Sequence, residues 1–567
     1  MSVVQYEVRP GAYYDSVVLM QLQRALAGLP GVADAGVVMA TAANRELLAA
    51  SGLLPDKIEA KADDLLIVVK AENETAAGEA ISQVDSLLQQ RRSTAATAFR
   101  PRSLEAALKM VPDAGWVLIS VPGRYAAGVA HEALDQGRHV FLYSDNVALE
   151  DELSLKHKAH RKGLLVMGPD CGTAIVNGVG LGFANRVRRG NIGLVGASGT
   201  GLQAITSHIH SLGGGVSQAI GTGGRDLKAE IGAITARQAL DLLSRDAETK
   251  VIVLVSKPPS PEVATRLLAA AQATDKQVVV NFLGHPVTAR RLDNLHFATS
   301  LSEAAEMAVG IGEWRVEIGD IPEPQALVAG FASQRYLRGL FSGGTLAYEA
   351  LLGLQMMLSP IYSNVPIREE QRLPDPWVSR GHTILDLGED DFTQGRLHPM
   401  LDNDLRLRRL RQEAADAEVG LIILDVVLGE GAHPDPASEL APAIVEAKKE
   451  RPDLEVVAIV VGTDEDPQDL NGQIERLIAA GATVFPGVGE AVDYVSHGLK
   501  QPAANTFPRV PLNAFHEPLA AVNVGLETFY DSLKVQGAEV VQVDWRPPAG
   551  GNEKLMTILA KMKARGT

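Results

Sequence analysis

Cysteine is almost absent from this sequence, with one residue, Cys171, in 567. A single cysteine cannot form an intrachain disulfide, nor can it supply a zinc or iron–sulfur site built from several thiolates. Long hydrophobic runs are also missing: the longest, such as 251–255, have the length of a strand, far below the ~20 residues that a membrane helix needs. Basic residues are outnumbered, with 53 Lys and Arg against 69 Asp and Glu, a net charge of −16. Because nucleic acids and anionic membranes bind basic surfaces, this balance argues against both as partners.

The remaining composition is that of a globular protein. Hydrophobic residues make up 46% and charged residues 22%, and the length suits about three to five domains. The first residues show no basic segment followed by an apolar run, so we expect no secretory signal. We therefore expect a soluble, cytoplasmic, multidomain protein.

Residues 1–95 predict a small separate unit. Strands are expected at 3–8, 35–40 and 65–69, and apolar residues at helical spacing predict helices over 16–29 and 76–88. The resulting order of strand, helix, strand, strand, helix predicts a ferredoxin-like or ACT-like α+β fold.

Beyond this unit, short apolar strands alternate with helices, which predicts α/β domains with parallel sheets covered on both faces. We expect a Rossmann-like domain at 96–190 and two flavodoxin-like domains at 191–325 and 330–505. The two flavodoxin-like segments match each other, because each opens with a strand, a glycine-rich turn and a helix. Residues 511–567 predict a shorter C-terminal tail with a helix, a strand and a last helix.

The two glycine-rich turns are candidate phosphate-binding sites. A helix that follows such a turn presents free backbone N–H groups at its positive end, and hydroxyl groups beside them add donors. Neither turn has the sequence of a phosphate loop or of a dinucleotide fingerprint, and the glycines of either one could simply form the tight turn of a βα unit. Since the turns occur in matched domains, we predict that both helix starts bind one phosphate or sulfate, through Ser198, Gly199, Thr200, Ser342, Gly343, Gly344 and Thr345.

Two further loops carry candidate site residues. Asp170 and Cys171 directly follow a predicted strand, where sites of parallel sheets lie, although a turn or packing role suits Cys171 better than a catalytic thiol. We predict catalytic roles for Asp386, Arg396 and His398, with the arginine as an anion clamp and a histidine of near-neutral pKa as general acid or base. The alternative for this segment is a solvated charged loop. No spacing of metal ligands supports a metal site.

Several of these segments resemble the succinyl-CoA synthetase family. Residues 114–283 resemble its alpha subunit, with the Gly-Pro-Asp-Cys loop, the Ser-Gly-Thr helix start and the loop 221–226. Residues 335–490 resemble the carboxyl-terminal domain of its beta subunit. The resemblance implies that the Rossmann-like domain at 96–190 is of the coenzyme A-binding kind. It also implies that the two helix starts point at a phosphoryl group during its transfer.

The order of the whole chain resembles the FdrA family. The N-terminal Gly-Ala-Tyr-Tyr-Asp-Ser segment, Gly395-Arg396-Leu397-His398-Pro399-Met400 and the tail segment 543–548 carry this resemblance. It implies a subunit of an oxamate carbamoyltransferase in purine (allantoin) degradation, which interconverts oxamate and carbamoyl phosphate with oxalurate and phosphate. The backbone donors would then hold the phosphate, Arg396 or Arg225 would neutralise charge, and separately encoded subunits would complete the complex.

The chain departs from the synthetases at three points. It lacks a glycine run over 91–115, it has only Gly284-His285-Pro286 where the synthetases carry their phosphorylated histidine, and it has no room for an ATP-grasp module. These departures place coenzyme A and nucleotide binding in doubt, so we predict no firm cofactor and favour the carbamoyltransferase. Two alternatives stay open: an acyl-CoA ligase whose missing modules belong to partner chains, and a non-catalytic scaffold that binds a small anion.

Overall fold

The computed structural model describes residues 3–10, 16–40, 44–45, 48–49, 52–54, 58–61, 64–88, 101, 103–285, 290–312, 335–355, 357–393, 396–499, 520–524 and 527–543. The chain divides into two compact units, 1–500 and 501–567. Of the features expected from the sequence, Gly11–Asp15, Gly395, the segment 544–548 and the last helix lie outside the described residues. Within the described part, no helix has the length and apolar character to cross a membrane.

The N-terminal domain is a small α+β unit, as predicted. Its elements are β1 (Val3–Arg9), α1 (Ser16–Ala27), β2 (Val32–Met39), β3 (Leu65–Ala71) and α3 (Glu74–Ser82). The sheet has the order β1-β3-β2 and is antiparallel. The apolar sequence of β3 fills the centre of the sheet, and its alternate residues Ile67 and Val69 pack with Leu26 of α1 in one buried core.

A three-stranded parallel sheet follows, of order β4-β5-β6. The domain around this sheet comprises α5 (Leu104–Met110), β4 (Trp116–Ile119), α6 (Gly123–Asp135), β5 (His139–Leu142), α7 (Leu149–Lys162) and β6 (Val166–Met167). The sheet ends earlier than the segment expected up to residue 190, because β7 (Thr173–Val176) and β8 (Val179–Gly182) join the next sheet. A buried ion pair links the two parts: Lys156 Nζ of α7 lies 2.7 Å from Asp226 Oδ1.

The next domain is built on an eight-stranded sheet of order β13-β14-β12-β11-β9-β10-β7-β8. Its elements are β9 (Arg189–Gly196), α8 (Gly199–Ser211), β10 (Val216–Gly221), α9 (Ile234–Arg245), β11 (Val251–Ser256), α10 (Pro261–Gln272), β12 (Gln277–Phe282), β13 (Arg291–Leu292), β14 (Leu295–Phe297) and α11 (Leu301–Ile311). The strands from β9 onward that pair in parallel have the flavodoxin-like order 2-1-3-4-5. The predicted flavodoxin-like fold is therefore confirmed.

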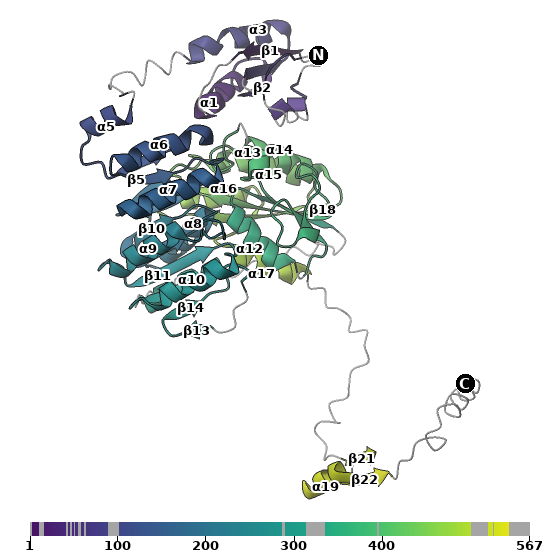
Figure 1. Ribbon diagram of the computed structural model, residues 1–567. Coiled ribbons are helices and arrows are strands. Elements are labelled where there is room, and N and C mark those ends of the chain that lie inside the picture. The colour runs from purple at the N-terminus through teal and green to yellow at the C-terminus, as the bar shows by residue number, and fades with distance from the viewer. Residues whose placement is uncertain are drawn as a thin grey trace, which may run out of the picture. The chain divides into compact units, whose positions relative to one another are not determined.

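The third α/β domain is built on a six-stranded parallel sheet, β16-β17-β15-β18-β19-β20. Without the edge strand β16, its strands have the same 2-1-3-4-5 order as the preceding domain. Its elements are β15 (Tyr336–Phe341), α12 (Gly344–Leu354), β16 (Ile361–Ser363), β17 (His382–Asp386), α13 (Asp390–Thr393), α14 (Asp404–Ala415), β18 (Val419–Val427), α15 (Pro436–Glu450), β19 (Glu455–Val461), α16 (Leu470–Ala479), β20 (Thr483–Phe485) and α17 (Val488–Leu499). Figure 1 shows its helices (green) beside those of the preceding domain (blue to teal). One hydrophobic core includes Leu202 and Ile205 of α8 together with Leu346 and Leu351 of α12, so the two domains pack through their first helices.

The second unit contains a strand–helix–strand motif within its described residues. Strands β21 (Ala520–Val524) and β22 (Glu539–Val543) pair in parallel, and α19 (Glu527–Val535) connects them. The helix and the strand lie where the sequence predicts them in the tail.

Candidate anion site at two helix starts

The two glycine-rich turns meet in the structure. Each follows the first strand of its domain and opens the first helix, α8 or α12. Ser198 is the N-cap of α8, where its side chain accepts a hydrogen bond from the Gly201 N–H, and its Oγ lies 2.5 Å from Thr345 Oγ1 in α12. The approach requires glycine, because a Cβ on Gly343 would lie 2.6 Å from Thr200 Cγ2. Both turns therefore lie side by side, and their binding of one shared anion stays a prediction.

The free backbone donors at this site come from the first residues of both helices. The N–H groups of Gly199 and Thr200 in α8, and of Gly344 and Thr345 in α12, have no partner among the described residues, as expected for the first turn of a helix. Each helix dipole adds positive potential at its own start, and the two starts are in contact. This combination is suited to a phosphate or sulfate ion.

Ser342 does not contribute the donor that the sequence suggested. Its N–H and its hydroxyl both donate to Asp425 Oδ1, at 2.7 and 2.9 Å, and the Gly343 N–H donates to Asp425 Oδ2 at 2.9 Å. Asp425 belongs to β18 and is fully buried. Its carboxylate holds the turn in place, so the oxyanion donors of α12 begin at Gly344.

Asp386 lies directly at the start of α12. It ends β17, is 3% exposed, and its Oδ2 lies 2.1 Å from the position that a Cβ on Gly344 would take. Burial, with Glu389 and Asp425 adding to it and Lys257 opposing it, raises the pKa of Asp386 to about 7. A protonated Asp386 can donate to an oxyanion, whereas the ionised form competes with it for the helix start.

Lys257 is a cation of this site that the sequence reasoning missed. Its Nζ would lie 3.0 Å from a Cβ added at Gly344, and it lies 4.0 Å from Glu389 Oε1. Lys257 follows the buried strand β11 at the edge where the glycine turns also lie. A lone lysine directly after an apolar strand of the repeated domain was the signal that could have identified it.

His398 also borders the turn of the third domain. A Cβ added at Gly388 would lie 2.8 Å from His398 Nε2, 3.0 Å from the Ser342 carbonyl oxygen and 3.1 Å from Asp386 Oδ1. These three groups therefore surround Gly388. Burial, helped by Arg406, lowers the pKa of His398 to about 4, not near neutrality as we expected. Because Nδ1 accepts from the Met400 N–H at 3.2 Å, the neutral ring carries its proton on Nε2 and acts as a hydrogen-bond donor.

Arg396 lies elsewhere, although it is two residues from His398. Its Nε donates to Asn44 Oδ1 of the N-terminal domain at 2.8 Å, and its guanidinium lies 5.9 Å from the ring centroid of Trp377. Turns flank the two residues, since the Arg396 N–H donates to the Thr393 carbonyl oxygen and the N–H groups of Leu401 and Asp402 donate to the His398 carbonyl oxygen. The two side chains have different partners, so they do not act from one face of an extended segment. The predicted anion clamp at Arg396 is not part of the phosphate site.

The predicted substrate-binding residues lie around the loop 168–173. Arg225 is held by Glu152 Oε2 at 2.8 Å and by the Val147 carbonyl oxygen, so its guanidinium is engaged in the three-stranded domain. Cys171 is buried, and burial raises the pKa of its thiol to about 12, which leaves it unreactive.

Asp170 is exposed at the surface, and desolvation by its surroundings, together with Asp145, Glu389 and Asp390, raises its pKa to about 7. Thr173 of the same loop lies at the start of α8: its hydroxyl is 3.3 Å from the position of a Cβ on Gly199, and it is buried without a hydrogen-bond partner. It is a further donor facing this helix start.

Comparison with known proteins assigns most of the chain. Residues 340–496 match the CoA-ligase family, residues 187–284 match the CoA binding domain, and residues 1–102 match the domain described as AllF, heavy metal-associated domain. The chain is 43% identical over 491 residues to the uncharacterized protein YahF of Escherichia coli (strain K12). The aligned region covers 84% of this chain and 95% of YahF. The chain belongs to the family of YahF. With its CoA-ligase and CoA binding domains, this is a succinyl-CoA synthetase-like protein.

Similarity to enzymes of known activity is partial. The alpha 1 subunit of the ADP-forming succinate–CoA ligase of Archaeoglobus fulgidus is 31% identical over 144 residues, which cover 25% of this chain and 48% of that subunit. A dinucleotide-forming acetyl-coenzyme A synthetase of Ca. Korarchaeum cryptofilum, solved with phosphate and ADP, aligns over 70% of this chain and 85% of its own, at 15% identity and a TM-score of 0.29. A TM-score this low carries no argument about function.

These findings overturn the predicted carbamoyltransferase. The matched domains are those of CoA ligases, and the relatives of named activity are CoA ligase subunits, so the assignment to carbamoyl transfer and to allantoin degradation was wrong. The matched domains also indicate that coenzyme A or a nucleotide is involved, which the sequence reasoning had placed in doubt. The resemblance to succinyl-CoA synthetase is confirmed.

Proposed function

We propose that the chain is the ligase subunit of an acid–thiol ligase of the succinate–CoA ligase type, with coenzyme A as a substrate. The observation that carries the proposal is the contact between Ser198 and Thr345, which brings two helix starts together inside the matched domains and supports a shared oxyanion site there. The N–H groups of both starts, the Lys257 ammonium and the Nε2–H of His398 provide donors for a phosphoryl group.

The chain would supply the phosphoryl and thioester chemistry, and a partner subunit would supply nucleotide activation. The matched family models are a CoA-ligase and a CoA binding domain, and the related ligase proteins are themselves subunits, as their names state. The finer assignment, to the FdrA group, rests on the Gly-Arg-Leu-His-Pro-Met and Asp-Trp-Arg-Pro-Pro segments and is part of this proposal.

Each residue around the proposed site has a separate task. A phosphate oxygen held between α8 and α12 is stabilised by both dipoles, and the unpartnered Thr173 hydroxyl supports the α8 side. Asp386 must be protonated, or move aside, when the dianion occupies the start of α12. Asp425 keeps the turn before α12 rigid, because it accepts three hydrogen bonds from it.

The partial reaction that needs no nucleotide tests this proposal. In it a phosphate oxygen attacks the thioester carbonyl of succinyl-CoA, the C–S bond breaks, and the products are succinyl phosphate and coenzyme A, whose thiolate takes up a proton. We expect the full chain to release free thiol in a phosphate-dependent manner, as followed with a thiol reagent, and hydroxylamine to trap the acyl phosphate. Acetyl-CoA and propionyl-CoA compare the acyl groups.

The result that contradicts the proposal is equally direct. If the chain binds phosphate but neither binds coenzyme A in calorimetry nor releases it from any of these thioesters, it is an anion-binding scaffold. The variant Gly344→Ala, which should perturb only the start of α12, must abolish the phosphate-dependent release, whereas Gly128→Ala, with nothing within 4 Å of the added Cβ, must retain it.

A further inference from the structure

Lys257 brings a primary amine close to the start of α12. Its Nζ would lie 3.0 Å from a Cβ added at Gly344. Since the Cβ and the nitrogen of one residue are about 2.5 Å apart, Nζ lies within about 5.5 Å of the Gly344 nitrogen. An acyl group bonded to a phosphate at this helix start is therefore within reach of the amine.

The ammonium of Lys257 is held only loosely. Its ion pair with Glu389 Oε1 spans 4.0 Å, and its side chain is 38% exposed. Lys156, in contrast, is fully buried, with its Nζ 2.9 Å from Glu152 Oε1 and 2.7 Å from Asp226 Oδ1. Because the four-carbon stem of a lysine is flexible, a loosely held ammonium can move toward a neighbouring electrophile.

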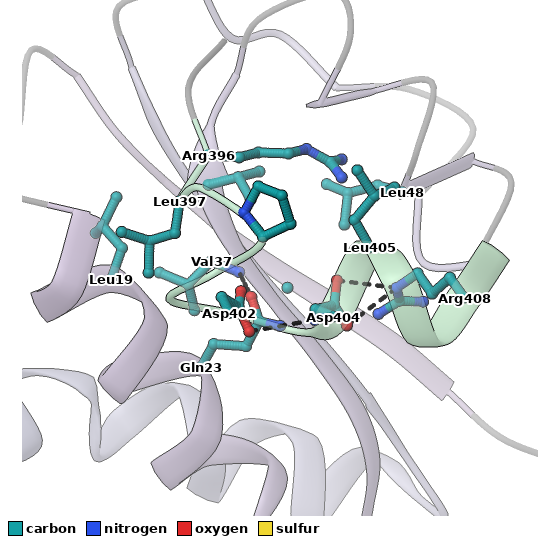
Figure 2. A pocket seen from close by; sticks show the side chains of 13 residues that line it. Leu19, Gln23, Val37, Leu48, Arg396, Leu397, Asp402, Asp404, Leu405 and Arg408 are labelled. Atoms are coloured by element: carbon teal, nitrogen blue, oxygen red, sulfur yellow. Dashed lines mark hydrogen bonds and ion pairs between the residues drawn. The ribbon is translucent and has the colours of Figure 1, made fainter. Parts of the chain in front are cut away.

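The cavity between the N-terminal domain and the segment 396–408 offers no comparable place for an acyl phosphate. Figure 2 shows Arg396 and Arg408 of its lining together with Asp402 and Asp404. Two arginines and two aspartates leave this lining without net positive charge, and Arg408 already pairs with Asp404 at 3.0 Å. No lysine lines the cavity, so it also has no amine that could be acylated.

We propose that Lys257 is a modification site, which is acylated by an acyl phosphate bound at the helix starts. The inference rests on the proposed function, since that reaction forms the acyl phosphate. The ammonium first gives one proton to water, and the free amine then attacks the carbonyl carbon. The C–N bond forms, and the bond between the carbonyl carbon and the phosphate oxygen breaks. Phosphate leaves with the electron pair and takes up a proton from the nitrogen, so the products are an amide on Nζ and hydrogen phosphate.

This modification regulates the site at which it occurs. An acylated lysine carries no charge, so the modified chain lacks the cation beside the start of α12. Its affinity for oxyanions should fall by about 10-fold. Acyl phosphate that coenzyme A does not consume therefore lowers the affinity of its own binding site.

Acetyl phosphate is the probe for this reaction, because it needs neither a thioester nor a partner subunit. The full chain is incubated with it at about pH 8 and cleaved with a protease that does not recognise lysine, and mass spectrometry follows acetylation of each lysine. We expect Lys257 to be acetylated at least ~10-fold faster than Lys250, although Lys250 is exposed and lies at the other end of β11. Sulfate, which competes for the helix starts, should abolish this difference.

The variant Lys257→Arg keeps the positive charge and removes the amine. Treatment with acetyl phosphate should lower the sulfate affinity of the wild type by about 10-fold in calorimetry and leave that of Lys257→Arg unchanged. Melting temperatures before and after treatment show that the chains stay folded. An equal loss of sulfate affinity in both proteins would place the effect at other lysines and overturn the proposal.

The rates of acetylation decide the remaining outcomes. Equal rates at Lys257 and Lys250, or a rate at Lys257 that sulfate does not lower, would also overturn the proposal. Failure of the ligase reaction is recognised separately, because acetyl phosphate is supplied from outside. Fast, sulfate-sensitive acetylation of Lys257 without phosphate-dependent release of coenzyme A would contradict the proposed function alone, whereas release of coenzyme A without this acetylation would contradict the modification site alone.

Discussion

The hydroxyl groups of Ser198 and Thr345 lie 2.5 Å apart, although 147 residues separate them in the chain. Each belongs to the first turn of the first helix in its domain. The contact brings together the first turns of two helices, whose Gly199, Thr200, Gly344 and Thr345 N–H groups have no partner among the described residues. The matched glycine turns of the sequence thus lie side by side in the structure.

The first prediction concerns Gly344. In Gly344→Ala the new Cβ would lie 2.1 Å from Asp386 Oδ2 and 3.0 Å from Lys257 Nζ, so the carboxylate must shift into the anion position. We expect sulfate affinity, measured by calorimetry, to fall at least ~10-fold. Gly128→Ala in α6 has open space around its Cβ, and alanine favours helix, so it should keep its affinity and gain up to about 1 kcal/mol of stability. Equal sulfate affinity in the two variants would contradict the assignment.

The second prediction concerns pH. Because the pKa of Asp386 is raised to about 7, the carboxyl is largely protonated below that pH and becomes a competing anion above it. We expect sulfate, which keeps its charge over this range, to bind more weakly as pH rises from about 6 to 8. In Asp386→Asn this fall should disappear. A wild-type affinity that does not change with pH would remove Asp386 from the site.

The same shift has a consequence for stability. A carboxyl whose pKa is higher in the folded than in the unfolded state stabilises the fold at low pH, and this contribution is lost as pH rises through the folded value. We therefore expect the melting temperature of the wild type to fall relative to Asp386→Asn between about pH 4 and pH 7. Parallel melting curves of the two proteins over this range would show that Asp386 is not buried as described.

The third prediction concerns Lys257. Lys257→Met removes the ammonium next to the start of α12 and should weaken sulfate binding by about 10-fold at low ionic strength, with a smaller effect in high salt. Lys250→Met is the matched control, since Lys250 lies at the opposite end of the same strand β11. If both variants bind sulfate equally at constant ionic strength, the lysine does not face the ion.

The fourth prediction concerns His398. With a pKa lowered to about 4 and its proton on Nε2, the imidazole donates a hydrogen bond and does not exchange a proton near neutral pH. His398→Gln, which keeps an N–H donor, should bind sulfate within about threefold of the wild type, whereas His398→Phe should lose about 10-fold. A His398 ring signal that titrates between about pH 6 and 7 in NMR would show that the general acid–base role was right after all.

The fifth prediction follows from the proposal that a partner subunit supplies nucleotide activation. The purified chain should not form succinyl-CoA from succinate, ATP and coenzyme A, and ³²P from labelled ATP should not appear on a histidine. Addition of the nucleotide-activating partner should restore the full reaction. Thioester formation by the chain alone would show that its ATP site lies in a part of the sequence that does not resemble an ATP-grasp module.

The strand and helix pattern was readable from the sequence because its signals are local. Apolar runs such as 251–255 and the glycine turns recur at matching places, and together they predict the flavodoxin-like domains. Side-chain directions were less accessible, since they depend on contacts distant in the chain. Nothing near Ser342 reveals that its hydroxyl bonds Asp425, and nothing near Arg396 reveals that Asn44 of the N-terminal domain binds it. Lys257 was missed because a lysine after a strand is common at protein surfaces.

The two flavodoxin-like domains belong to one polypeptide, which has a consequence for oxyanion binding when the protein is diluted. Where two helix starts belong to separate polypeptides, an ion site between them is present only while the polypeptides associate, so occupancy depends on protein concentration. In this chain both starts lie on one polypeptide, at residues 198–200 and 343–345. Its affinity for an oxyanion should therefore be the same at nanomolar and at micromolar protein, and any concentration dependence that appears would report the arrival of another subunit.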